Sequence, residues 1–207
     1  MQTGIFCFRN DLRLHDNQAL SAALDTCDKL HLVYAFEDRL WKGFAPNRIS
    51  THRARFILES LQCLMEQINN LGGGLNIIYG NIELSIPLFM HKHRAEICFL
   101  SQESAWEENK TEEALSKVVP TILANNATLL HPNDLPFALS NLPETFTQFR
   151  KKVEKSWIVR PFVTPPRSLN SCDTTHTNLP TLSDLGFFNN TLDPRSCFTF
   201  HGGSSSG

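Results

Sequence analysis

The chain has 207 residues, of which 41% are hydrophobic and 19% are charged, and its formal net charge at pH 7 is −2. This composition is typical of a folded globular chain and argues against a disordered one. The near-neutral charge leaves no large basic surface for nucleic acid. No apolar run approaches the length of a membrane span, and the first residues already have strand character. We therefore expect a cytoplasmic protein without a signal peptide or membrane contact.

Five short apolar runs predict β-strands, at residues 4–8, 30–35, 75–79, 97–100 and 127–131. The second run is continuously apolar, which is typical of a strand covered on both faces of a sheet. Between the second and third runs, residues 41–50 are rich in Gly, Pro and Asn and indicate a loop.

Helical patterns separate the runs, at residues 17–24, 57–71, 87–93, 106–119 and 143–155. Asp16 is the expected N-cap of the first helix. Apolar residues recur at three- and four-residue spacing in the second helix, which Gly72 ends. The third pattern is weaker, and Pro120 stops the fourth.

Strands that alternate with helices predict an α/β fold, a doubly wound five-stranded parallel sheet with helices on both faces. The expected strand order is 3-2-1-4-5. We assign residues 1–155 to this domain and residues 156–207, which show little periodicity, to an irregular C-terminal connector.

The six cysteines include no C-x-x-C pair. Cys7 and Cys98 lie in strand-like runs, and Cys63 lies in a helical pattern. These positions favour buried free thiols in a reducing compartment over a disulfide framework.

In an open parallel sheet, ligands bind beyond the carboxyl ends of the strands, where the strand order reverses. For this order the crevice lies between the first and fourth strands, beside the loops at residues 9–13 and 101–105. Phe36, at the end of the second strand, is expected to flank it. The candidate ligand-binding residues are Arg9, Asp11, Phe36, Gln102, Glu103 and Ser104.

Glu103 is the strongest candidate, because a carboxylate can accept paired hydrogen bonds from a planar ring that carries adjacent N–H donors. The alternative is that acidic residues here complement the dipole at the start of the next helix. For Glu107 and Glu108, a solvated helix face is the better interpretation.

The other polar groups give weaker signals. Arg9, Asp11, Arg13 and Asp16 also fit a salt-bridged loop that anchors the first helix. His91 and His93 lack the further ligands of a zinc site. The chain has no G-x-G-x-x-G after its first strand, no Walker lysine and no nucleophile signature, so no catalytic residue is predicted. The residues by themselves therefore indicate a small-ligand-binding α/β domain.

Residues 8–17 (FRNDLRLHDN) closely resemble the opening of photolyases and cryptochromes. Residues 52–61 (HRARFILESL), 131–137 (HPNDLPF) and 142–151 (LPETFTQFRK) resemble the DASH branch of that family. Residues 198–204 (FTFHGGS) resemble the run that leads into its helical domain. The resemblance therefore covers nearly the whole chain, but less than half of a family member.

The resemblance implies several properties. A full-length member carries FAD in a C-terminal helical domain and repairs cyclobutane pyrimidine dimers, mainly in single-stranded DNA, by blue-light-driven electron transfer. The α/β domain holds an antenna chromophore, often methenyltetrahydrofolate, and Glu103 matches the glutamate that binds the pterin. We expect this chain alone to be a catalytically inactive monomer that contacts DNA little and binds folate weakly or not at all, because the helical domain supplies the other half of the pocket.

Two alternatives remain open. The chain could be a free-standing nucleotide- or flavin-binding module on the same α/β fold. It could also be a protein-interaction module, which an exposed apolar patch of Phe146, Phe149 and Phe162 would support. The basic residues 150–152 are better interpreted as a solvated helix end than as a phosphate site.

Overall fold

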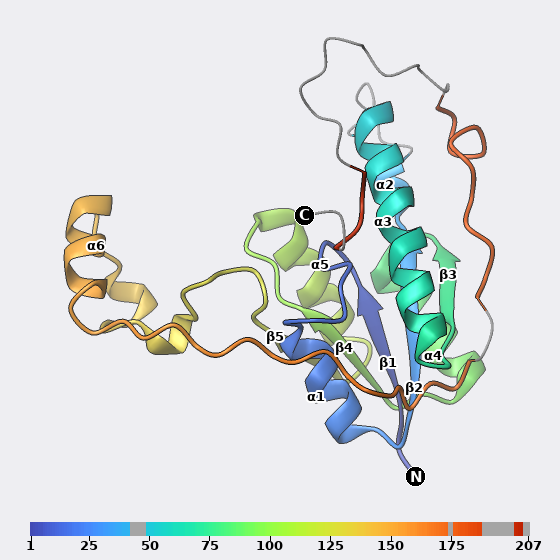
Figure 1. The fold of residues 1–207 in the computed structure, drawn as a ribbon, viewed down its shortest axis with the longest axis horizontal. Helices are drawn as coiled ribbons and strands as arrows, with labels where there is room; N and C mark the ends of the chain where they lie inside the picture. Colours follow the sequence, from blue (N-terminus) through green and yellow to red (C-terminus); the bar gives the residue numbers. More distant parts are fainter. Residues whose placement is uncertain (42–48, 174–175, 188–200, 205–207) are drawn as a thin grey trace.

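The computed structural model describes residues 1–41, 49–173, 176–187 and 201–204. Its centre is a five-stranded parallel sheet in the order β3-β2-β1-β4-β5, which confirms the predicted fold class and strand order (Figure 1). The strands are β1 (Thr3–Phe8), β2 (Lys29–Phe36), β3 (Leu75–Tyr79), β4 (Ile97–Ser101) and β5 (Thr121–Ala124).

Helices cover both faces of the sheet. One face packs on α1 (Gln18–Thr26) and α3 (Thr51–Asn70), and the other packs on α4 (Ile82–His93) and α5 (Trp106–Ser116). The alternation of side chains along each strand divides the core: in β1, Phe6 and Phe8 face the first pair of helices, whereas Ile5 and Cys7 face the second. A sheet buried on both faces explains why its central strands are continuously apolar.

The last strand lies earlier than predicted. β5 is Thr121–Ala124 and pairs with β4 from Cys98↔Thr121 to Ser101↔Ala124, whereas residues 127–131 form no strand. Two short apolar runs follow Pro120, and periodicity does not distinguish them. Pairing with β4 selects the first of the two runs, because α5 ends at Ser116 and the chain re-enters the sheet directly after Pro120.

The cap of α1 was misplaced by one residue. Asn17 is the N-cap, and its side chain accepts a hydrogen bond from Leu20 N at 3.0 Å. Asp16 instead has a positive φ of 46° and pairs with the connector, since its backbone N–H donates to Val163 O at 2.7 Å. Asn and Asp cap equally well, so composition alone does not separate them.

Other boundaries also moved. The helix predicted at residues 87–93 begins at Ile82 and contains Pro87, because Ile82, Ile86 and Met90 form one buried stripe. The helix predicted at residues 106–119 ends at Ser116, and the one predicted at residues 143–155 is α6 (Phe146–Val153). A short helix, α2 (Asp38–Trp41), follows β2 and was not predicted.

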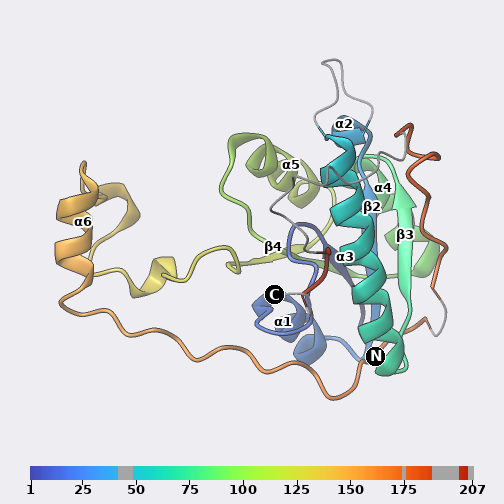
Figure 2. The ribbon, with the colours of Figure 1, turned by 45° about the horizontal axis from the view of Figure 1, so that its top comes forward.

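Residues 125–162 form an extended arm that carries α6 away from the sheet (Figures 1 and 2). The arm includes the short 3-10 helices η1 (Pro132–Asp134) and η2 (Leu139–Asn141). In α6 the buried residue is Val153. Large exposed hydrophobic side chains of the arm are Leu129, Leu139, Leu142, Phe146, Trp157, Ile158, Val159 and Phe162.

The connector returns along the sheet and is fastened to it. Ser171 forms a bridge with Leu30, and Asp173 Oδ2 lies 2.8 Å from His31 Nδ1 and accepts a hydrogen bond from Asn76 Nδ2 at 2.7 Å. His31 is buried in β2, so this clasp is partly shielded from water.

Five cysteines lie in the described residues, and all five are free thiols, as predicted. Cys7, Cys27 and Cys98 are buried, but Cys63 and Cys172 are only partly buried. Cys197 and residues 198–200 of the C-terminal motif lie outside the described residues. Burial raises the pKa of the Cys7 thiol to about 12. No helix of the described residues is both long enough and apolar enough to span a bilayer.

Candidate ligand-binding site

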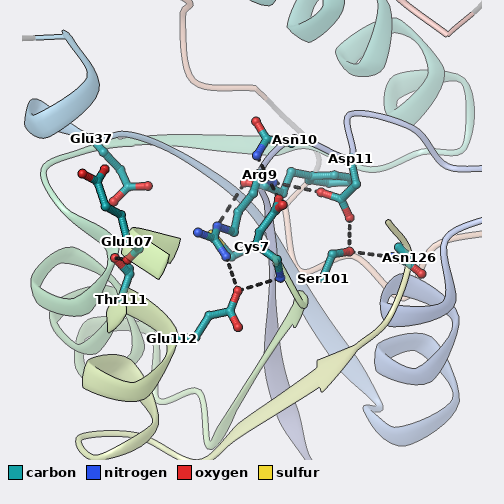
Figure 3. Close-up of polar contacts among 12 residues, drawn as sticks. Cys7, Arg9, Asn10, Asp11, Glu37, Ser101, Glu107, Thr111, Glu112 and Asn126 are labelled. Atoms are coloured by element: carbon teal, nitrogen blue, oxygen red, sulfur yellow. Dashed lines mark hydrogen bonds and ion pairs between the residues drawn. The ribbon is translucent and has the colours of Figure 1, made fainter. Parts of the chain in front are cut away.

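Asp11 anchors the loop that follows β1. Its carboxylate is buried and accepts hydrogen bonds from Arg9 N at 3.0 Å, from Asn17 Nδ2 at 3.1 Å and from the hydroxyl of Ser101. Asn126 donates to the same hydroxyl at 2.5 Å (Figure 3). Hydrogen bonds to the helix cap and to β4 therefore anchor this loop, but in the described structure no ion pair joins Arg9, Asp11, Arg13 and Asp16, so the predicted salt bridges are wrong.

Arg9 forms a buried ion pair with Glu112 of α5, which Figure 3 shows in the crevice between the β1 loop and that helix. The distance from Nη1 to Oε1 is 2.6 Å, and the two side chains are 8% and 4% exposed. The same Glu112 oxygen accepts a hydrogen bond from Glu103 N at 2.9 Å. The ion pair thus fixes the backbone of the loop after β4.

A crevice lies at the strand ends, but it borders β1, β2 and α5, and no residue of the loop at 101–105 lines it, so it is displaced from the predicted place between β1 and β4; it is also nearly filled. Its cavity volume is about 70 Å³, whereas pockets for small organic ligands usually measure about 300–1,000 Å³. Arg9 and Asn10 line it together with Glu37, Arg39 and Thr111. The side chains of the protein itself occupy the place where a ligand would bind in an open sheet.

Arg39 spans this crevice. Its Nη1 donates to Thr111 Oγ1 at 2.8 Å, and its Nη2 donates to Glu37 Oε2 at 2.5 Å and to the carboxylate of Glu83. Burial acts to lower the pKa of Arg39, but the nearby Glu37 and Glu83 outweigh it and raise that pKa above its usual value. The guanidinium therefore stays charged and ties α2 to α4 and α5.

A larger groove opens beside the crevice, between the loop after β4 and the root of the arm. Its volume is about 660 Å³, within the usual range for ligand pockets. Gln102, Glu103 and Ser104 form its polar edge together with Asn109 and Asn125. Its apolar wall consists of Leu129, Leu130, Leu135, Leu139, Phe149 and Trp157.

Glu103 is half-buried at the edge of this groove. Its Oε1 accepts a hydrogen bond from Asn10 Nδ2 at 2.9 Å, and among the described residues Oε2 has no donor. The cap residue of α5 is Ala105, which makes no side-chain cap bond. Glu103 is therefore oriented by Asn10 and does not cap the helix.

The structure separates the six candidate residues. Gln102, Glu103 and Ser104 line one groove, Arg9 is paired in the crevice, and Asp11 is buried under its hydrogen bonds. Phe36 does not face the crevice as expected. It is 2% exposed and packs on Trp41 and Tyr79, because its position in β2 turns it toward the α3 side of the sheet.

The sequence analysis missed Arg39 and Glu112. Arg39 lies in the short helix that was not predicted. Glu112 stands three residues before the buried Leu115 on the inner face of α5, and a carboxylate on a buried helical stripe signals a buried partner. The apolar wall residues were missed because they come from the arm, whose course over the β4 loop follows no periodicity.

Sequence comparisons relate the chain to one family of known proteins. The sequence model of the DNA photolyase family matches residues 5–167. Cryptochrome DASH of Gloeobacter violaceus is 34% identical over 215 residues, covering 100% of this chain and 43% of the relative. Cryptochrome DASH of Xenopus laevis is 32% identical and covers 97% of this chain and 41% of the relative. The chain thus spans less than half the length of these relatives.

Solved structures of photolyases and cryptochromes have the same fold as this chain. The cryptochrome of Synechocystis sp. PCC6803 superposes with a TM-score of 0.85 at 31% identity, covering 99% of this chain and 44% of that protein. The photolyase of Sulfolobus tokodaii, whose structure contains two FAD molecules and was described as implying a novel light-harvesting cofactor, gives a TM-score of 0.75 at 25% identity and covers 98% and 44%. This chain belongs to the DNA photolyase family, as an N-terminal α/β domain related to cryptochrome DASH.

Proposed function

We propose that the groove beside Glu103 is one wall of a binding site for a pterin-type antenna chromophore such as methenyltetrahydrofolate. The observation that carries the proposal is the position of Glu103, a half-buried carboxylate with one oxygen held by Asn10 at the edge of a groove of about 660 Å³. A pterin carries adjacent N–H donors on a flat ring. A fixed carboxylate matches such a pair of donors, and the apolar wall suits the ring faces.

Antenna binding needs rigid placement and no bond chemistry, since energy transfer depends on distance and orientation. The loop that carries Glu103 is fixed in two places: Glu103 N donates to Glu112, and Gln102 N donates to Ala124 O at 2.8 Å. A polar anchor on a fixed element meets the requirement for a preorganised site. Gln102 and Ser104, which line the same edge, would contact the ring substituents.

The whole protein would have a second half. We propose that a chain as long as the cryptochrome DASH relatives adds a helical domain that binds FAD and closes the groove. It would repair cyclobutane pyrimidine dimers, mainly in single-stranded DNA, under blue light. Residues 1–207 would be catalytically inactive alone, because the FAD site would lie in the second half of the whole protein.

The exposed arm supports a docking role for this part of the chain. Phe146 and Phe162 are 75% and 70% exposed, as the interaction-module alternative requires, and Phe149 lines the groove. Monomers seldom leave such apolar surface uncovered. We propose that the arm packs on the helical domain of the full-length protein. The crevice of about 70 Å³ does not support the free-standing flavin module, although a neighbouring cavity of about 380 Å³ lies beside Arg9 and Tyr34.

Titration of the 207-residue chain with methenyltetrahydrofolate tests the antenna proposal. We expect weak, saturable binding that E103Q weakens at least about tenfold, the usual effect of losing a charge-assisted hydrogen bond. The matched control is E113Q, since Glu113 is an exposed carboxylate of α5 that pairs with Lys110. Equal affinity of E103Q and the wild-type chain would refute the role of Glu103.

A further inference from the structure

The crevice at the ends of β1 and β2 is a separate cavity from the Glu103 groove. Open parallel sheets bind ligands beyond the carboxyl ends of their strands, yet the cavity here is about 70 Å³. That volume is several times below the usual range for ligand pockets, about 300–1,000 Å³, so the crevice excludes a fused aromatic ring system.

Arg39 is the side chain that takes up the space. It is anchored to three separate elements: to Glu37 at the end of β2, to Glu83 in the first turn of α4 and to Thr111 on the second turn of α5. Glu37 is itself buried and accepts a hydrogen bond from Ile82 N at 3.4 Å. A planar guanidinium bound in this way acts as a crossbar between the two helices that border the crevice.

The second barrier is the ion pair of Arg9 and Glu112, which is more deeply buried than the Arg39 network. A ligand that displaced either arginine would leave buried carboxylates without a partner, and an uncompensated buried charge is strongly unfavourable. Ligand binding therefore has to compete with the ion pairs of both arginines, although Nε of Arg39 is buried without a hydrogen-bond partner.

We propose that Arg39 is a specificity-determining residue that closes this crevice to flavin-sized planar ligands. The network excludes such rings from the crevice between Arg9 and Thr111, whereas a neighbouring cavity of about 380 Å³, lined by Arg9, Tyr34 and Phe56, stays open. The inference goes beyond the antenna proposal and does not depend on it, since it concerns a different cavity and a different class of ligand.

The test uses flavin mononucleotide as the probe and follows its fluorescence on titration with the 207-residue chain. In the variant E37Q/R39A, R39A removes the guanidinium that joins the elements around the crevice, and E37Q removes the carboxylate charge that would otherwise be left without a partner. We expect no saturable binding to the wild-type chain and at least about tenfold tighter binding to the variant. The matched control is K110A, because Lys110 is an exposed cation of α5 with a surface partner. It should behave as the wild-type chain.

Equal behaviour of the wild-type chain and E37Q/R39A, whether both bind or neither does, would overturn the proposal. Thermal unfolding of each protein shows whether the variant is folded. If it is not, a wild-type crystal soaked in flavin mononucleotide decides the matter on the intact fold. An empty crevice supports the proposal, and flavin density between Arg9 and Thr111 overturns it. The outcome of the flavin experiments does not depend on whether the chain binds methenyltetrahydrofolate, so the two proposals can fail separately.

Discussion

Arg9 and Glu112 are 103 residues apart in sequence, yet Nη1 of one lies 2.6 Å from Oε1 of the other, in the crevice between the β1 loop and α5. The same carboxylate holds the backbone of Glu103. The pair therefore links the turn after β1 to the loop that borders the proposed ligand groove.

Replacing Glu112 tests this link. E112A leaves the buried guanidinium of Arg9 without its counter-charge, and breaking such a pair typically costs about 3–5 kcal/mol. Urea unfolding should show a loss of this size. The control variant E113A removes the exposed neighbour that pairs with Lys110 and should unfold as the wild-type chain does. Similar midpoints for the two variants would show that the buried pair adds nothing.

Asp11 should matter for stability rather than for ligand contact. D11A leaves the donors on Arg9, Asn17 and Ser101 unsatisfied, for which we expect a cost of about 2–4 kcal/mol in urea unfolding. D25A is the matched control, because Asp25 is an exposed carboxylate of α1. If D11A unfolds like D25A but loses folate binding, Asp11 contacts the ligand and the structural role assigned to it is wrong.

The clasp of the connector should weaken in acid. Burial acts to raise the pKa of Asp173, but hydrogen bonds from His31 and Asn76 outweigh it and lower that pKa. A carboxyl group whose pKa is lower in the folded chain than in the unfolded chain stabilises the fold. This stabilisation is complete above the unfolded pKa, about 3.9 for aspartate. It is lost as the pH falls from about 3.9 through the pKa of the folded chain.

Urea unfolding between about pH 6 and pH 3 measures the effect, with the unfolded aspartate pKa near 3.9 inside the range. We expect the stability of the wild-type chain to fall more steeply below about pH 4 than that of D173N. D25N should retain the wild-type slope. If the stability of the wild-type chain and that of D173N fall equally with pH, the contact of Asp173 with His31 and Asn76 does not stabilise the fold.

The arm should be the first part of the chain that trypsin cuts. An eight-residue helix with Val153 as its buried side chain is too short to be stable without packing. Limited digestion followed by mass spectrometry should show early cleavage at Arg150, Lys151 and Lys152, before cleavage at Lys110 within the packed α5. Early cleavage at Lys110 with an intact arm would mean that α6 is covered in solution.

Much of the fold could be predicted because binary patterning and strand alternation are strong signals. The doubly wound parallel sheet and the bounds of β3 follow from short apolar runs between helical stripes. The position of β5 did not follow, since two apolar runs after Pro120 look alike and only pairing with β4 decides between them. The cap at Asn17 was missed for a similar reason, because Asp16 is an equally good cap.

The candidate site was predictable in part. The loop at Gln102, Glu103 and Ser104 lies at a cavity because the end of β4 must lie beside the end of β1. Which of two neighbouring cavities it lines depends on the buried side chain of Arg9 and the partly exposed side chain of Arg39. Their partners lie on other elements, so no local pattern specifies them. Likewise, Phe36 alternates to the core face, although it stands at the correct end of its strand.

The most direct test of the ligand groove is chemical-shift mapping of the isotope-labelled 207-residue chain during titration with methenyltetrahydrofolate. The account predicts saturable shifts concentrated at residues 102–104, at Asn109 and at Trp157, which E103Q reduces and E113Q leaves unchanged. Shifts concentrated at Glu37, Arg39 and Thr111 would place the ligand in the crevice and would contradict the central claim.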